Sequence, residues 1–282
     1  MDHNSLSNLL LNISLFTYLG STILYLAYFI FRSPMLGLGG TIATIGGFIV
    51  QTSGIIRRWV ESYQMGPNMG HAPLSNMYES LVFFAWSIAL IYIFLEYRSK
   101  NRLLGAFVMP FAFLSMALGS LLNKDIQPLV NALQSNWLIA HVVTCFLGYA
   151  AFAIACGLGI MYLLKATQSK EDGLLAALPP QRWIEDLTHK TILFGFLLLT
   201  AGIITGAIWA NSAWGTYWSW DPKETWSLIT WFIYGATLHA RFTKGWGGKR
   251  IAWLAVLGFL SVIFTYYGVN FLLSGLHSYG SN

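Results

Sequence analysis

Charged side chains are scarce in this sequence. Of its 282 residues, 16 are Lys or Arg and 11 are Asp or Glu, which is 10% of the chain, whereas an average soluble domain has about 25% charged residues. So few charges cannot cover the surface of a chain of this length in water. This shortage excludes a soluble enzyme, and an apolar content of 56% excludes a disordered chain.

The few charges are also clustered, and long segments have none. A helix that crosses a bilayer needs about 20 predominantly apolar residues, and the segments without any Asp, Glu, Lys or Arg are long enough to provide this. A membrane β-barrel would instead show alternation in pieces of about 10 residues. The pattern predicts an all-α, polytopic membrane protein, and the charge-free segments are 3–31, 33–56, 103–123, 126–164, 191–220 and 251–282.

Cysteine is nearly absent. Cys145 and Cys156 lie in one apolar run and would be about 16 Å apart on a helix, which is too far for a disulfide bond. The sequence has no CxxC and no CxxCH motif, so the chain is neither a thiol oxidoreductase nor a c-type cytochrome. Nucleic acid is excluded as a partner because the net charge of +5 has no soluble face to occupy.

About eight transmembrane helices account for the chain. The third and seventh are the least apolar, because each has only 16 consecutive residues without charge (80–95 and 225–240). No connecting segment is long enough to form a soluble domain. The expected helices are 9–31, 36–56, 77–95, 103–122, 137–164, 190–209, 225–241 and 251–273.

Basic residues predict the orientation, since cytoplasmic loops carry an excess of Lys and Arg. If the N-terminus is outside, twelve of the sixteen basic residues fall on the inner side and four fall on the outer side. The outer four are Arg57, Arg58, Lys124 and Lys223. The segment between the sixth and seventh helices is then extracytoplasmic.

That extracytoplasmic segment is rich in tryptophan. Half of the twelve tryptophans lie within 23 residues, and the segment reads WANSAWGTYWSWDPKETW at 209–226. An aromatic belt at the membrane interface is the simplest interpretation, but a belt would be shared among all helix ends. We therefore favour a surface that binds a large, flat, apolar ligand by stacking. Its residues are Trp209, Trp214, Trp218, Trp220, Asp221 and Trp226.

Two histidines flank this segment on the expected outer side. His141 is at the start of the fifth helix, and His277 follows the eighth. Two neutral imidazoles can take both axial positions of a haem iron, although either histidine alone would be read as an interfacial residue. His239 lies within the seventh helix, about 20 Å from Trp226 along its axis, and is either a functional residue inside the membrane or an interfacial one.

The other candidate residues have ordinary explanations. His3, His71 and His189 are read as residues without a ligand role. Glu79 could face the interior of the helical bundle, cap a helix N-terminus or lie at the headgroups. No Ser, Cys or carboxylate stands in a pattern that suggests a nucleophile.

At this point the sequence resembles a known family. WGTYWSWDPKETW at 214–226 resembles the WWD signature of membrane proteins that handle haem during cytochrome c maturation, and its KETW ending and the chain length are similar to the CcsA (ResC) family. Three further segments resemble that family, namely PLSNMYESLVFFAW at 73–86, QSNWLIAHV at 134–142 and GLHSYG at 275–280. The resemblance divides the chain into two N-terminal helices, 1–70, and a haem-handling core, 71–282.

The resemblance implies a role for each matching residue. His141 and His277 would be axial ligands to a non-covalently held haem b on the WWD segment, and His239 would be a ligand to a haem within the membrane, with its mate on the partner CcsB (ResB). The family passes haem to the CxxCH motif of an apocytochrome c outside the membrane. The chain would then be one subunit of a CcsBA cytochrome c synthase, or haem lyase.

Two alternatives remain open from the sequence. One is a haem transporter or chaperone of the CcmC type, which shares the WWD segment and two outer histidines but has no synthase activity. The other is a structural membrane subunit with an aromatic belt. The implied location is a bacterial cytoplasmic (inner) membrane or a thylakoid membrane, with the site facing the periplasm, the exterior or the lumen.

Overall fold

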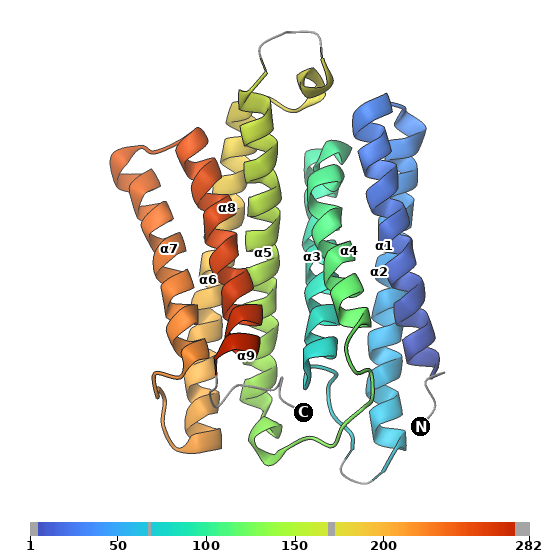
Figure 1. Cartoon of the computed structure of the whole chain (residues 1–282), viewed down its shortest axis with the longest axis vertical. Coiled ribbons are helices and arrows are strands. Elements are labelled where there is room, and N and C mark those ends of the chain that lie inside the picture. Colours follow the sequence, from blue (N-terminus) through green and yellow to red (C-terminus); the bar gives the residue numbers. More distant parts are fainter. Residues whose placement is uncertain (1–4, 67–68, 169–172, 274–282) are drawn as a thin grey trace. The chain divides into compact units, whose positions relative to one another are not determined.

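The computed structural model describes residues 5–66, 69–168 and 173–273, and the described residues are mostly helical (Figure 1). Two compact units make up the chain, Met1–Ser135 and Asn136–Asn282. The boundary between them therefore falls well after residue 70, where the family resemblance begins. His277 lies outside the described residues.

The first unit contains four long helices. They are α1 (Leu6–Phe31), α2 (Pro34–Gln64), α3 (Met77–Ser99) and α4 (Gly105–Ser120), with short 3-10 turns η1 (Arg102–Leu104) and η2 (Asn131–Leu133). Helix α1 packs against α2 and α4, and α3 packs against α4. Glycines at a spacing of seven allow α2 to approach α1 closely, because a Cβ at Gly40, Gly47 or Gly54 would lie within 2.9 Å of a side chain of α1.

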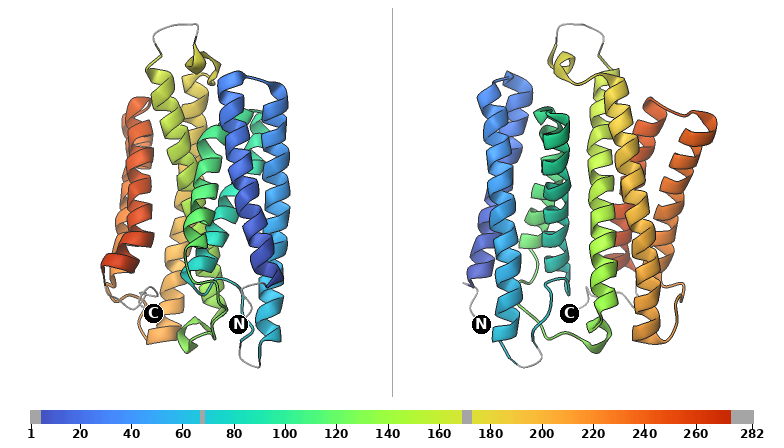
Figure 2. Two further views of the ribbon diagram at one scale, coloured as in Figure 1. Left: turned by 45° about the vertical axis from the view of Figure 1, so that its right-hand side comes forward. Right: turned by 180° about the vertical axis from the view of Figure 1, so that it is seen from behind.

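The described residues of the second unit also form a bundle of long helices (Figure 2). They are α5 (Asn136–Ala166), α6 (Gln181–Trp214), α7 (Pro222–Lys244) and α8 (Lys249–Ile263), and the 3-10 turn η3 (Leu174–Ala177) precedes α6. Helix α8 continues through the π-helical turn η4 (Phe264–Gly268) into α9 (Val269–Leu272). Helix α5 packs against α6 and α8, and α7 packs against both of these.

Seven of the described helical segments are long and apolar enough to cross a membrane. The seventh expected helix, α7, is not among them, because the Thr, Ser, Trp, Tyr and His residues of its interior lower its mean hydropathy. It nevertheless has 23 residues, about 34 Å of helix. The chain is therefore an all-helical, multi-pass membrane protein with close to the eight helices that the sequence predicts.

Helices α2 and α6 are longer than predicted. Helix α2 continues past residue 56 to Gln64, and α6 begins at Gln181 and continues past Trp209 to Trp214. Charged side chains set the predicted end of α2 and the predicted start of α6, but they do not end a helix, since Arg, Glu and Lys are good helix formers. The extension of α6 past Trp209 contains no charged residue. The segment between α6 and α7 is consequently shorter than predicted and comprises residues 215–221.

A buried ion pair holds one end of the first unit together. Arg58 Nε lies 2.7 Å from Glu79 Oε1, and both side chains are almost fully buried. Arg58 also donates to the Lys124 carbonyl at 2.9 Å, and Glu79 Oε2 accepts from the backbone N–H and hydroxyl of Ser75. Of the three readings that the sequence allowed for Glu79, the structure supports two: its side chain is buried in the bundle, and it accepts from the Ser75 N–H at the start of α3.

Further hydrogen bonds around this ion pair hold the segment 73–80 in place. Asn76 caps α3 by accepting from the Glu79 N–H at 2.9 Å, and a His71 ring nitrogen lies 3.1 Å from the Ser75 hydroxyl. His71 is itself buried and hydrogen-bonded to the Met69 carbonyl. These residues tie the loop before α3 to α2 and to the segment after α4.

We predict that Glu79→Ala destabilises the protein by about 3–5 kcal/mol, because it leaves the Arg58 guanidinium buried without its counter-charge. The matched control is Asp186→Ala, which breaks an exposed ion pair with Lys190 and should cost about 0–1 kcal/mol. Unfolding in mixed micelles with increasing dodecyl sulfate measures both. Equal losses in the two variants would contradict the structural role of the buried pair.

Candidate functional site

The Trp-rich segment is a short turn between two helices. Helix α6 ends at Trp214 because Gly215 adopts a left-handed conformation (φ 79°) and its N–H bonds to the Asn211 carbonyl. Glycine takes this conformation without steric cost. Helix α7 then begins at Pro222, where the absence of an N–H does no harm.

Two carboxylates determine the shape of this turn. Asp221 caps α7 by accepting from the Lys223 N–H at 2.9 Å, and Glu224 reaches back to accept from the Asp221 N–H at 3.2 Å. This is a capping box. Glu224 Oε2 also accepts from the Ser219 N–H at 2.8 Å. Asp221 and Glu224 therefore hold residues 219–221 in one conformation.

The turn presents aromatic side chains to the outside of the second unit. Trp220 is 68% exposed and has a left-handed backbone (φ 60°), which is uncommon for a bulky residue. Its ring lies edge-on to Trp218 at 5.7 Å between centroids. Tyr217 in the same turn is also exposed. This cluster is the part of the segment that is open to a ligand.

The remaining tryptophans, together with Trp231, pack against other side chains of the unit. Trp209 is fully buried and lies 4.8 Å from Trp214, between ring centroids. Trp226 packs on Phe264 at 4.1 Å, and Trp231 donates to the Thr200 hydroxyl at 2.8 Å. The tryptophan-rich sequence thus serves two purposes, since some of its rings build the support and others are exposed on it.

His141 is held in one orientation beside this support. Its ring stacks on Trp209 with 5.9 Å between centroids and 17° between the planes. Its Nδ1 lies 2.7 Å from the Gly202 carbonyl oxygen. Since a carbonyl only accepts, Nδ1 carries the proton, and in the neutral ring Nε2 then carries the lone pair. This is the tautomer that a histidine needs to coordinate a metal through Nε2.

The approach of α5 to α6 leaves no room for larger residues near His141. A Cβ at Gly206 would lie 2.5 Å from His141 Nδ1, and a Cβ at Gly202 would lie 2.5 Å from Cys145 Sγ. Both cysteines are free and buried, as the sequence predicts. The two glycines therefore let the His141 ring lie flat between the two helices.

The beginning of α7 is fastened to the end of α8. Lys223 Nζ donates to Asn270 Oδ1 at 3.0 Å, and the Thr265 hydroxyl donates to the Trp226 carbonyl at 3.2 Å. The turn 215–221 and residue 273 consequently lie at the same end of the second unit, together with the start of α5 (Figure 1).

The predicted site residues therefore fall into three groups. The structure brings His141 together with Trp209 and places the turn containing Trp218, Trp220 and Asp221 at the same end of the unit. His239 is exposed near the opposite end of α7. His277 is outside the described residues, in the segment that follows Leu273. Within the described ranges, no three His, Cys, Asp or Glu side chains gather as metal ligands.

No structural role was predicted from the sequence for Glu224, Lys223, Gly202 or Gly206. Glu224 could have been found, because Asp at the cap with Glu three positions later is the pattern of a capping box. Nothing in the sequence alone indicates that Lys223 reaches Asn270, since that contact depends on how α7 and α8 pack.

We predict that Glu224→Ala loosens the turn, because it removes the acceptor for two backbone N–H groups. Loss of a cap costs about 1 kcal/mol, so amide hydrogen exchange at Ser219 and Asp221 should accelerate about fivefold. Asp186→Ala, which removes an exposed carboxylate at the far end of α6, is the control. Unchanged exchange in the Glu224 variant would show that the turn is held by other contacts.

Comparison with known proteins agrees with this architecture. A family model described as cytochrome C assembly protein matches residues 74–277. The chain is 44% identical to the cytochrome c biogenesis protein CcsA of Guillardia theta, over 95% of each chain, and 40% identical to that of Pyropia yezoensis, over 94% and 95%. The CcsA of Gloeobacter violaceus is 38% identical over 88% of each chain.

The fold is also similar to a solved structure of the cytochrome c haem lyase CcmF. The TM-score is 0.70 at 17% sequence identity, and the match covers 94% of this chain but 48% of that one. The chain thus spans about half the length of CcmF, and the likeness is one of fold. Together with the family model and the relatives above, it leads to one conclusion: this chain belongs to the CcsA family of cytochrome c assembly proteins.

Proposed function

We propose that this chain receives haem and holds it at the turn 215–221 while the haem is attached to the CxxCH motif of an apocytochrome c. It would act as the CcsA subunit of a CcsBA cytochrome c synthase, together with CcsB. The observation that carries the proposal is His141. Its Nδ1–H bond to the Gly202 carbonyl leaves Nε2 as the coordinating atom, at the same end of the unit as an exposed tryptophan turn.

The described residues fit a haem. Trp218 and Trp220 offer aromatic surface, and burial of apolar area contributes about 25 cal/mol per Å². In the described part of the chain, the buried Trp218 Nε1 has no acceptor, and a haem propionate carboxylate is an acceptor of the required kind. His141 would supply one axial ligand and His277 the second, with the haem held non-covalently as haem b.

Some residues of the site would contact the haem, and others would hold those residues in place. Asp221 and Glu224 would act by holding the turn, and Trp209 by holding the His141 ring. Trp214 and Trp226 would support the part of the unit on which Trp218 and Trp220 lie. The likeness to CcmF, which is described as a haem lyase, supports the synthase over a transporter of the CcmC type.

Attachment requires no nucleophile from this chain. Each thiol of the apocytochrome adds across one haem vinyl group, so that the S–H hydrogen and the sulfur are both retained in the thioether product. The chain would contribute by positioning the vinyl groups against the thiols, which is worth several kcal/mol when two groups are well oriented. The histidine of CxxCH would then replace His141 or His277 on the iron.

Co-expression with CcsB and a CxxCH substrate tests the proposal. We expect covalent haem in the substrate and a Soret band in the purified complex. Trp220→Ala should lower the yield of holocytochrome severalfold, whereas Trp253→Ala, which removes an exposed tryptophan of α8, should leave it unchanged. A complex that binds haem but never yields covalent product would favour the transporter.

For the axial ligands, we predict that His141→Ala abolishes most holocytochrome formation and that imidazole in the medium restores it, because imidazole can occupy the open position on the iron. His277→Ala should behave in the same way. His189→Ala is the control, since His189 packs on Phe242 away from the turn. Failure of imidazole to restore either variant would contradict axial ligation.

His239 should act earlier in the path. It is exposed on α7, as a residue that shares a haem with a partner subunit would be. We predict that His239→Ala reduces the amount of haem that reaches the outer site. Added imidazole should not send the haem to the inner side of the membrane instead. Wild-type haem occupancy in this variant, measured from the Soret band per protein, would leave His239 as an interfacial residue.

The side of the membrane can be tested independently of haem. With Cys145 and Cys156 replaced by Ala, single cysteines at Ser135 and Ser212 should react with a membrane-impermeant thiol reagent added outside, because the charge bias places both there. A cysteine at Thr243 should react only after lysis. Labelling of Ser135 and Ser212 from opposite sides would contradict the proposed orientation.

A further inference from the structure

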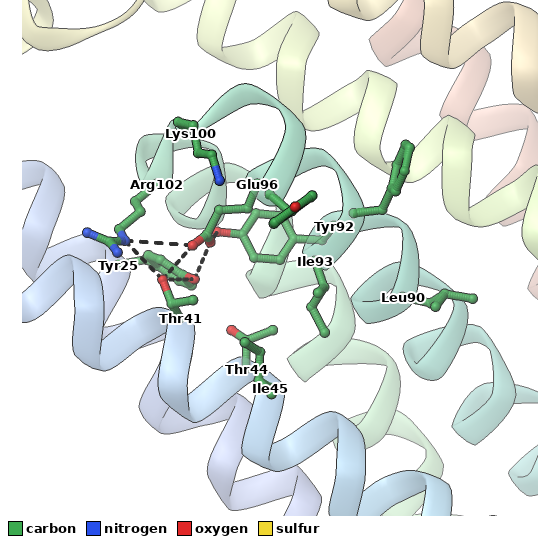
Figure 3. Close-up of a pocket in the computed structure, with 12 residues that line it drawn as sticks. Tyr25, Thr41, Thr44, Ile45, Leu90, Tyr92, Ile93, Glu96, Lys100 and Arg102 are labelled. Atoms are coloured by element: carbon green, nitrogen blue, oxygen red, sulfur yellow. Dashed lines mark hydrogen bonds and ion pairs between the residues drawn. The ribbon is translucent and has the colours of Figure 1, made fainter.

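A cavity of about 710 Å³ lies in the first unit (Figure 3). It is near the end of α3, whereas Glu79 of the buried ion pair is at the start of that helix. It is formed where α1, α2 and α3 meet the turn η1. The residues that carry the argument are Thr41, Ile45, Leu90, Glu96, Lys100 and Arg102. This cavity belongs to a different unit from His141 and the tryptophan turn, and the function proposed above does not use it.

The floor of the cavity is a buried carboxylate whose oxygens are already bonded. Glu96 accepts from the Tyr25 hydroxyl at 2.6 Å, from the Thr41 hydroxyl at 2.5 Å and from the Tyr92 hydroxyl. Figure 3 shows these groups converging on the Glu96 carboxylate. A carboxylate with three hydroxyl donors is well satisfied where it is, so the floor is a structural element and not the part that attracts a ligand.

Two cationic side chains, Lys100 and Arg102, also line the cavity near the Glu96 carboxylate. Arg102 Nε lies 3.7 Å from Glu96 Oε1 and donates to the Thr41 hydroxyl at 3.1 Å, and its side chain is 37% exposed. Lys100 Nζ lies 4.2 Å from the centroid of the Tyr97 ring. Glu96 balances one of these charges, so the group Glu96, Lys100 and Arg102 retains one net positive charge, and this favours an anionic ligand.

The walls of the cavity are apolar and open to the side. Ile45, Leu90 and Phe94 line it, and they are 40%, 37% and 61% exposed on the unit. In a helix that crosses a membrane, such residues accommodate hydrocarbon. The ligand that fits both features has an anionic head and a long apolar tail.

We propose that this cavity binds an anionic glycerophospholipid. Its phosphate would lie against Lys100 and Arg102, and an acyl chain would run along Ile45, Leu90 and Phe94. The charge bias places this end of the helices on the inner side of the membrane, where basic pockets between helices bind lipid headgroups. Haem is the less suitable anion, because the cavity lining contains no His, Cys or Met and the Tyr25 and Tyr92 hydroxyls already bond to Glu96.

Native mass spectrometry of the full chain in detergent tests the proposal with dioleoyl phosphatidylglycerol and dioleoyl phosphatidylcholine in equal amounts. The wild type should retain phosphatidylglycerol preferentially. Lys100→Gln should lower that retention about fivefold, the effect expected for one basic residue near a headgroup, and Lys100→Gln with Arg102→Gln should abolish the preference. Arg98→Gln is the matched control, because Arg98 is exposed on the same helix end and outside the cavity.

A second variant separates the cavity from its charges. Ile93→Trp fills the cavity without changing any charge and should also lower retention, while gel filtration reports whether each variant remains folded. Equal losses in Arg98→Gln and Lys100→Gln would overturn the proposal, as non-specific attraction would then explain the binding. Displacement of the lipid by glycerol 3-phosphate alone, or by haemin in the wild type but not in Lys100→Gln, would overturn it in favour of a soluble anion or a porphyrin.

Discussion

The hydrogen bond from His141 Nδ1 to the Gly202 carbonyl, 2.7 Å long, is the constraint on which the arrangement of the second unit depends. It requires α5 and α6 to approach so closely that only hydrogen is tolerated as the side chain at positions 202 and 206. It also fixes the proton on Nδ1 and so determines which nitrogen of the ring can coordinate. The stack of His141 on Trp209 follows from the same approach, since the buried tryptophan fills the remaining space.

The tryptophan turn depends on a second and independent set of contacts. Asp221 and Glu224 hold its backbone through the capping box, and Lys223 and Thr265 attach the beginning of α7 to the end of α8. The acidic and basic residues within the WWD-like sequence therefore have structural tasks that a list of ligand-binding residues does not reveal. Among the aromatic residues, Trp209 is fully buried and Trp226 packs on Phe264, whereas Trp220 is exposed on the turn beside Trp218.

Much of the fold could be predicted because a membrane helix is recognised from the composition of one continuous stretch of sequence. Long segments without charge fixed the number and approximate position of the helices, and the clustering of tryptophan next to a helix end located the turn. The position of Gly215 between two tryptophans could also have predicted the end of α6, since glycine with a left-handed backbone commonly ends helices.

The remaining features depend on tertiary packing and could not be predicted from the sequence. The Arg58–Glu79 pair joins residues 21 positions apart, and Lys223 reaches an amide 47 positions away. Hydropathy sums over a window and does not indicate which face of a helix a charged residue occupies. The sequence does not predict the C-terminal extension of α2 or the early start of α6 for the same reason, because a charge ends an apolar run without ending a helix.

The most direct test of the central claim is the electron paramagnetic resonance spectrum of the ferric haem complex in a variant that alters only the space around His141. Gly206→Ala would place a Cβ 2.5 Å from His141 Nδ1, whereas Gly235→Ala would place one 3.4 Å from Phe196, which is an ordinary contact. We predict that Gly235→Ala keeps the low-spin spectrum of a bis-histidine haem and that Gly206→Ala loses it, although every tryptophan and histidine remains. An unchanged low-spin spectrum in Gly206→Ala would contradict the claim that this packing positions the axial ligand.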